Sequence, residues 1–333
     1  MSRVVKTLHR ISWAEGLRNG LWTAWVLGKI IFPVTLAVTA LQYTPAFDVL
    51  LSGLRPVMAP LGLPEEAAIP LLLGNLVNLY AAIGAMLSLE LTVKQVFILA
   101  VMLSFSHMLP GEGAICRRAG GSFLLITALR LGLAVLSAAV INLVWRGGKE
   151  RAAYSISPPA QAEPSGTGEI LLHALQAAAY GVLGLAAIVV PIMLLIQILR
   201  DLRFLDWFAA RMQPLMSPLG LAPRASVTMA SGLIFGLAFG AGVILQQARE
   251  QRFTRREITL ILVFLATCHA VVEDTLIFVP LGVDVLWLLL IRLAAAVALT
   301  ALLAALWREP GKLSPPPGRR GASPETSRRQ RRT

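Results

Sequence analysis

Charged residues are scarce in this chain: they occupy 14% of its 333 positions, whereas 56% are apolar and the mean hydropathy is +0.70. A water-soluble domain of this length cannot bury so much apolar surface. The charges also gather in short basic clusters between long uncharged runs. A helix needs roughly 20 apolar residues to cross the hydrocarbon layer, and these runs supply them. The sequence therefore predicts an all-α, multi-pass membrane protein.

Cysteine is almost absent, with two residues far apart, which excludes a disulfide framework and a cysteine-rich metal site. The basic, aromatic start of the chain has no signal-peptide pattern. No G-x-x-x-x-G-K-[ST], H-E-x-x-H or G-x-S-x-G motif occurs. We therefore expect no enzyme activity, no nucleotide hydrolysis and no cofactor.

The net charge of +12 is explained by the membrane rather than by nucleic acid. Eight of the 30 basic residues lie in the last 26, beside a membrane segment. Such a basic tail, with the basic loops, favours anionic lipid as the partner, and no nucleic acid is expected. Composition also divides the chain into five predicted parts. They are a basic amphipathic segment (1–25), a first repeat (26–146), a Pro/Ser-rich linker (147–170), a second repeat (171–308) and a disordered basic tail (309–333).

The two halves repeat each other. Residues 54–67 (LRPVMAPLGLPEEA) align with 212–225 (MQPLMSPLGLAPRA) at a shift of 158, with seven of fourteen positions identical. After four extra residues the shift becomes 162 and pairs distinctive residues: His107 with His269, Glu112 with Asp274, Arg130 with Arg292 and Trp145 with Trp307. Apolar bias cannot match such residues in register, so we infer a duplication.

The halves can be parallel or inverted. If 67–87 and 225–245 both span, each half has four crossings; if both are re-entrant hairpins, turning near Gly74–Asn75 and Ser231–Gly232, each has three. Positive-inside counting gives 22 Lys and Arg inside and 5 outside for the inverted model, against 20 and 7. We predict inverted repeats, each with an interfacial helix, a hairpin-like segment and about three spanning helices. The expected location is a bacterial-type inner membrane, with both termini cytoplasmic.

These motifs resemble a known family. Each half has a P-x-x-x-P-L-G-L element, a hairpin-like segment (GNLVNLYAAIGAM in the first) and a helix ending in S-H-x-x-P-G-E or C-H-A-V-V-E-D-T. This arrangement resembles a duplicated nucleoside recognition (Gate) domain. That domain is related to spore maturation proteins A and B, the membrane part of FeoB-type iron transporters and concentrative nucleoside transporters. The resemblance implies a transporter fold, and it says little about which solute is transported.

Ionisable residues inside membrane segments are costly, so they default to a functional hypothesis. His107 and His269 end the third segment of each half, and in the inverted model they would face opposite sides of the membrane. Carboxylates follow: Glu112 in the first half, Glu273 and Asp274 in the second. We interpret these residues as gates or proton sites, or as helix caps.

Polar residues at membrane depth give candidate solute contacts: Asn75, Asn78, Tyr80 and Ser231. They can equally bind helices together. Arg130 and Arg292 are predicted to form structural ion pairs with the carboxylates of their own halves. Cys268-His269 with Glu273-Asp274 is suggestive of a metal, but the first half lacks a matching set, so no metal site is predicted.

The sequence therefore predicts a permease for a small polar solute, for example a nucleoside-like one, driven by an ion gradient or passive. The alternative is a non-transporting scaffold or assembly factor of the spore-maturation type, and a ferrous-iron permease is the weaker third reading. The sequence is compatible with a homo-oligomer.

Overall fold

The computed structural model describes residues 11–45, 49, 52–154, 166–251 and 253–307. Its described residues are helical apart from loops and one isolated bridge between Thr92 and Arg151, so the all-α prediction is confirmed. The predicted basic tail (309–333) and the first ten residues of the N-terminal segment lie outside the described residues.

Among the described residues, five helical stretches are long and apolar enough to cross a membrane, or six with a pair bent by 91° at 55–76. Two further elements, α11 (Phe204–Met216) and α13 (Arg255–Thr267), are too short for such a span. The five stretches are α2 (Trp13–Leu41), α7 (Val93–Ser106) with α8 (Leu109–Arg118), α9 (Phe123–Val144), α10 (Thr167–Asp201) and α15 (Val285–Leu306). By this measure the first half has three spans and the second has two, where about three were expected in each.

Equivalent local sequences start equivalent helices in the two halves. Helix α7 (Val93–Ser106) begins at a capping box, in which Thr92 and Gln95 satisfy each other's backbone N–H groups. Helix α13 begins at a second one, made by Thr254 and Glu257, 162 residues further on. The repeat is therefore preserved in the helix ends as well as in the sequence.

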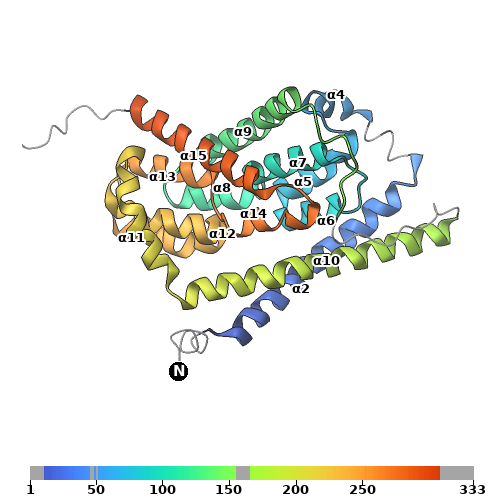
Figure 1. Cartoon of the computed structure of the whole chain (residues 1–333), viewed down its shortest axis with the longest axis horizontal. Helices are drawn as coiled ribbons and strands as arrows, with labels where there is room; N and C mark the ends of the chain where they lie inside the picture. Colours follow the sequence, from blue (N-terminus) through green and yellow to red (C-terminus); the bar gives the residue numbers. More distant parts are fainter. Residues whose placement is uncertain (1–10, 46–48, 50–51, 155–165, 252, 308–333) are drawn as a thin grey trace, which may run out of the picture.

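Helices α2 and α10 lie side by side and run in opposite directions (Figure 1). The backbone N–H of Ser12, before α2, donates to Asp201 at the end of α10 (2.7 Å). Gly20 of α2 lies against Val190, and Gly28 against Val182, so the residue numbers run in opposite senses along the contact. Helix α2 is continuous from Trp13 to Leu41, so it runs across residue 25, where the basic segment was predicted to end.

Each half contains a sharply folded hairpin. In the first, α5 (Ala68–Leu76) and α6 (Leu79–Met86) are joined through Val77 and Asn78. In the second, α12 (Ser226–Glu250) breaks at Gly236. Gly240 lies against Ser231, nine residues earlier, although a straight helix would separate them by about 13 Å. Gly74 lies against Ala82 in the same way. Because Asn78 and Gly236 are 158 residues apart, the two breaks are equivalent.

The predicted turns at Gly74–Asn75 and Ser231–Gly232 are therefore misplaced by about one helical turn. Gly74 packs against Leu103 of α7, and Gly232 packs against Leu265 of α13. A Cβ added at Gly74 would come within 2.2 Å of the Leu103 side chain, and one at Gly232 within 2.5 Å of Leu265. These glycines serve close helix packing, whereas Asn78 and Gly236 make the turns.

The two halves exchange parts of their cores. Buried Phe278, Leu281 and Val283 of the second half pack in the cluster that also holds α5, α6 and α7. In return, buried Cys116 and Ile126 of the first half pack against α11, α12 and α13. Neither half therefore has a complete core of its own.

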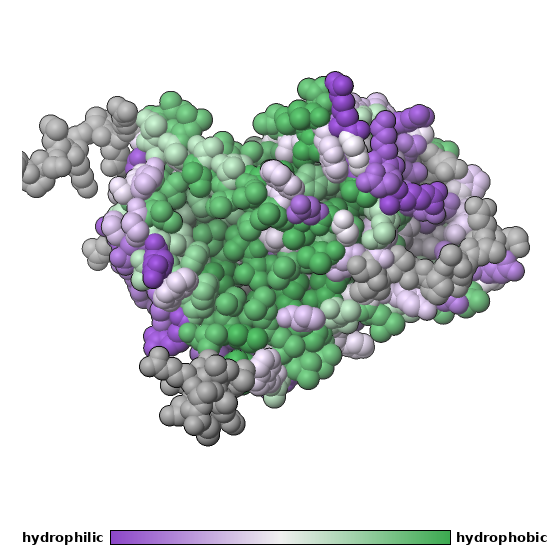
Figure 2. Space-filling view, in the orientation of Figure 1, coloured by the Kyte–Doolittle hydropathy of each residue, from purple (hydrophilic) through white to green (hydrophobic). Residues whose placement is uncertain are grey.

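The outer surface matches a membrane environment. Figure 2 shows a broad hydrophobic face between hydrophilic residues gathered toward two ends of the molecule. Large apolar side chains such as Leu124, Leu143 and Leu306 are at least three-quarters exposed. At one end, the start of the predicted linker is ordered: Gly148, Glu150 and Ala152 are hydrogen-bonded to the backbone at 91–94.

Gly236→Ala tests the turn of the second hairpin. Gly236 has φ 77° and ψ 177°, a conformation essentially confined to glycine, so alanine is expected to cost about 1–3 kcal/mol. Thermal unfolding of the purified protein should show a lower midpoint. Gly242→Ala, in the same helix with nothing within 4 Å of the added Cβ, is the matched control and should not lower it. Equal melting of both variants would contradict this account of the turn.

Candidate functional site

The two hairpins fix the ends of α7 and α13. After Ser106 and Thr267 each helix stops, and the next residues leave helical geometry. Met108 and Ala270 adopt positive φ values of 51° and 43°. Their N–H groups donate to the carbonyls of Gly74 (2.7 Å) and Gly232 (3.1 Å) in the hairpins. This repeated contact holds the intervening His107 and His269 at the breaks.

A buried arginine clamps each break. Arg130, on α9, donates from Nε to Phe105 O (2.6 Å) and from Nη2 to His107 O (2.8 Å), and its Nη1 pairs with Glu112 Oε2 (2.6 Å). Arg292, on α15, donates to His269 O (2.5 Å) and pairs with Asp274 Oδ2 (2.9 Å). The structure thus contains both ion pairs that the sequence suggested.

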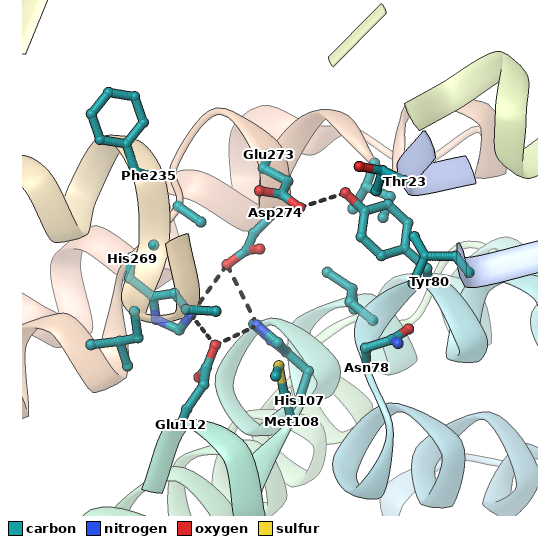
Figure 3. A pocket seen from close by; sticks show the side chains of 17 residues that line it. Thr23, Asn78, Tyr80, His107, Met108, Glu112, Phe235, His269, Glu273 and Asp274 are labelled. Atoms are coloured by element: carbon teal, nitrogen blue, oxygen red, sulfur yellow. Dashed lines mark hydrogen bonds and ion pairs between the residues drawn. The ribbon is translucent and has the colours of Figure 1, made fainter. Parts of the chain in front are cut away.

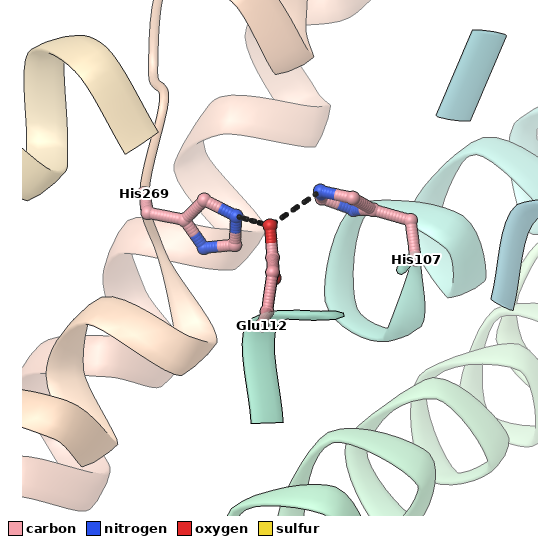
Figure 4. A group of neighbouring side chains, drawn as sticks. All are labelled: His107, Glu112 and His269. Atoms are coloured by element: carbon pink, nitrogen blue, oxygen red, sulfur yellow. Dashed lines mark hydrogen bonds and ion pairs between the residues drawn. The ribbon is translucent and has the colours of Figure 1, made fainter. Parts of the chain in front are cut away.

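The two histidines lie next to each other at the meeting of the halves, with ring centroids 5.2 Å apart. The expectation that one faces each side of the membrane is wrong, because the ends of α7 and α13 meet and bring the two rings together. Glu112 Oε1 lies 3.5 Å from His107 Nε2 and 3.1 Å from His269 Nε2 (Figure 4). Asp274 Oδ2 is 3.8 and 3.7 Å from the same two nitrogens.

The Nδ1 atom of each histidine ring is hydrogen-bonded to a backbone carbonyl. His107 Nδ1 lies 2.8 Å from Leu103 O, and His269 Nδ1 lies 2.7 Å from Leu265 O. A carbonyl only accepts, so each Nδ1 must carry the hydrogen. In the neutral ring, each Nε2 then presents a lone pair to the carboxylates.

The cluster borders a small cavity of about 190 Å³ between the halves (Figure 3). Both hairpin breaks line it, through Asn78 on one side and Gly236 on the other. Across it, the buried Tyr80 hydroxyl donates to the carboxylate of Glu273, which joins the first half to the second. The walls therefore combine an apolar lining with convergent ionisable groups, as in ligand sites.

The predicted solute contacts divide into two pairs. Asn78 and Tyr80 line the cavity, and Asn78 also caps α6 by accepting from Ala81 N (2.9 Å). Asn75 does not line it and accepts from Ser106 Oγ (2.7 Å). Ser231 is fully buried beside Gly240, inside the second hairpin. Asn75 therefore joins its hairpin to α7, whereas the Ser231 hydroxyl has no hydrogen-bond partner among the described residues.

Sequence reasoning missed part of the lining: Thr23, Leu27, Met108, Phe235, Gly236 and Ile277. A signal for Gly236 was available, because the 158-residue shift aligns it with Asn78. Thr23 and Leu27 come from α2, and nothing in their own sequence marks them.

A metal could be held by residues from both halves. Within the described ranges, His107, Glu112 and His269 form a buried group whose ligand atoms lie within 4.8 Å of one another. Cys268 is not part of it. The suspected set in the second half alone was therefore wrong: the first half supplies two of the three residues.

Arg130→Met tests the clamp. Removing one partner of a buried ion pair leaves an uncompensated charge and is expected to cost about 3–5 kcal/mol. Adding Glu112→Leu removes that charge and should restore much of the loss. Thermal unfolding measures both, and Arg118→Met, exposed at the end of α8, should change stability by less than about 0.5 kcal/mol. A double variant no more stable than Arg130→Met would contradict the pairing.

Comparison with known proteins agrees with this architecture. The family model described as nucleoside recognition (Gate) matches two regions, 24–134 and 182–282. The chain is 50% identical over 294 residues to the "Uncharacterized membrane protein YvoD" of Bacillus subtilis (strain 168), which covers 88% of this chain and 94% of that protein. No solved structure matches the chain. The two matched regions contain both hairpins and both histidines, and the chain belongs to the nucleoside recognition (Gate) family of multi-pass membrane proteins.

Proposed function

We propose that this protein is a permease for a small polar solute, in which two inverted halves form a shared pathway at the central cavity. The observation that carries the proposal is the meeting of two broken helices, at repeat-equivalent positions, beside one cavity lined by buried ionisable groups. Secondary transporters recurrently place their solute sites at such breaks, because unwound backbone at membrane depth is tolerated where it lines a site.

The course of the first helix of each half supports the inversion. Helices α2 and α10 occupy equivalent places in the repeat, since Pro33 of one aligns with Pro191 of the other. Equivalent helices that run in opposite directions are related by an axis across them, as in an inverted repeat. In this arrangement each hairpin has its turn beside the buried cluster, and it enters and leaves the membrane on the same side, as re-entrant elements do.

The residues take the following roles in the proposal. Asn78 and Tyr80 contact the solute, and His107, Glu112, His269, Glu273 and Asp274 form the gate between the halves. Because the sequence has no nucleotide-binding loop, the energy comes from an ion gradient or from the solute's own gradient. Basic loops and the C-terminal tail would lie on the cytoplasmic side, against anionic lipid.

Cysteine labelling tests the inversion. Arg117→Cys and Arg255→Cys are expected to react with a membrane-impermeant maleimide from the same side, because nearby Gly120 and Ile258 are in contact. Glu90→Cys, in the exposed pair with Arg151, should react from the opposite side. The native Cys116 and Cys268 are buried and serve as the background. Labelling of Arg117→Cys and Arg255→Cys from opposite sides would exclude the inverted arrangement.

A second labelling experiment separates a permease from a scaffold without knowledge of the solute. Ala238 lines the cavity and is exposed. A pathway that opens alternately should let Ala238→Cys react in both right-side-out and inside-out vesicles, whereas Arg117→Cys reacts in one type only. A scaffold has no need of a second opening. Reaction of Ala238→Cys from one side only, or from neither, would therefore favour the scaffold.

A further inference from the structure

We propose that His107, Glu112 and His269 bind a divalent transition-metal ion, and that such a cation is the solute class of the permease. The second clause rests on the proposed transport function, whereas the first can be tested by itself. The site is shared between the halves: His107 and Glu112 come from α7–α8 and His269 follows α13.

The spacing of the ligand atoms suits an ion. Metal–ligand bonds of about 2.0–2.2 Å place neighbouring ligand atoms roughly 3.0–3.6 Å apart. Glu112 Oε1 is 3.1 and 3.5 Å from the two histidine Nε2 atoms, so small side-chain movements close the site. Asp274 Oδ2, at 3.7–3.8 Å from both nitrogens, is close enough to become a fourth ligand.

The surrounding bonds orient these ligands. The Leu103 and Leu265 carbonyls hold the Nδ1–H group of each ring, which leaves both Nε2 lone pairs directed at Glu112. Metal-bound histidines almost always have such a partner on the second nitrogen. Arg130 binds Glu112 through Oε2 and leaves Oε1 toward the rings. Two nitrogen lone pairs facing carboxylate oxygens repel one another unless a cation lies between them.

The carboxylates in its lining and its small size suit the cavity beside the cluster to a cation. Three carboxylates line it, from Glu112, Glu273 and Asp274, while the guanidinium groups of Arg130 and Arg292 lie behind them and outside the lining. Its volume of about 190 Å³ is below the roughly 300 Å³ at which pockets for drug-sized molecules begin. A small cation therefore fits better than a bulky organic solute.

The ligand chemistry narrows the choice of ion. Two imidazole nitrogens with one or two carboxylate oxygens suit zinc, iron(II), cobalt(II) and nickel(II). Magnesium and calcium prefer oxygen ligands alone. Thiolate-selected copper(I) is not favoured, because Cys116 and Cys268 lie outside the group.

Cobalt(II) titration of the purified full-length protein tests the site through its visible absorption. Wild type should bind about one ion per chain, with bands of a low-coordinate site that zinc abolishes. His107→Ala should lower the affinity for cobalt(II) by about 100-fold or more. Loss of a residue that only supports a metal ligand typically costs about 10- to 100-fold, and loss of a ligand itself should cost at least as much. His173→Ala, a histidine on α10 outside the cluster, is the matched control and should bind as wild type does.

A ligand replacement guards against loss through misfolding. His269→Cys keeps a metal ligand at this place, so it should still bind cobalt(II) and gain an intense thiolate-to-cobalt band in the near ultraviolet. Saturating cobalt(II) that produces no site spectrum in wild type overturns the proposal and leaves protons as the cations of the cluster. Equal affinity of wild type and a folded His107→Ala overturns it as well.

A transport assay separates the proposal that a metal ion is the solute from the proposal that the protein is a permease. Proteoliposomes loaded with a metal-sensitive dye should show protein-dependent entry of cobalt(II) or zinc, lost in His107→Ala and kept in His173→Ala. Binding without entry would refute the metal as solute while the binding site stands. No metal binding, together with reaction of Ala238→Cys from both sides, would refute the metal and leave the permease intact.

Discussion

Two arginine side chains buried at the junction of the halves set the constraint on which the rest of this structure depends. Arg130 and Arg292 are 0% and 1% exposed, and a charge in a membrane interior is stable only with close partners. For each arginine these partners lie where a neighbouring helix ends, and they are a histidine carbonyl and a carboxylate. The helices must therefore break where they do. Their breaks bring His107 and His269 together, and the carboxylates that neutralise the arginines also face the histidine rings.

Duplication explains how such a site was assembled. One half supplies a hairpin, a broken helix and an arginine, but leaves its histidine and carboxylate facing an open side. The second copy closes that side with the same groups, and the exchange of core residues between the halves fixes the closure. The copies are not identical: Arg130 donates to two carbonyls, from Nε and Nη2, whereas Arg292 donates to one carbonyl and to Asp274, both from Nη2. The cavity is therefore asymmetric, with Tyr80 from one half bonded to Glu273 of the other.

The sequence predicted the helical membrane fold and the duplication, but it did not predict where along the halves the helix ends meet. Matched His, Arg and Trp residues at fixed shifts identified the duplication, and the capping boxes that start α7 and α13 follow from local sequence. The hairpin turns were misplaced because glycine marks both tight turns and close packing: Gly74 and Gly232 pack against leucines, while Asn78 and Gly236 turn the chain. The meeting of the two histidines could not be predicted, since periodicity gives the face of a helix and not the depth at which two helix ends meet. Hence the two histidines were predicted as two separate gates, and the suspected metal ligands were sought in the second half alone.

The claim that His107 and His269 lie together at the junction can be measured in the unaltered protein. The chain has four histidines, so histidine labelled with ¹³C and ¹⁵N gives a simple solid-state NMR spectrum in lipid bilayers. His107→Gln and His269→Gln variants assign the two ring signals. With ring centroids 5.2 Å apart, a through-space cross peak between them is expected. Two resolved ring signals without a cross peak, in a sample whose other short contacts are detected, would contradict the account.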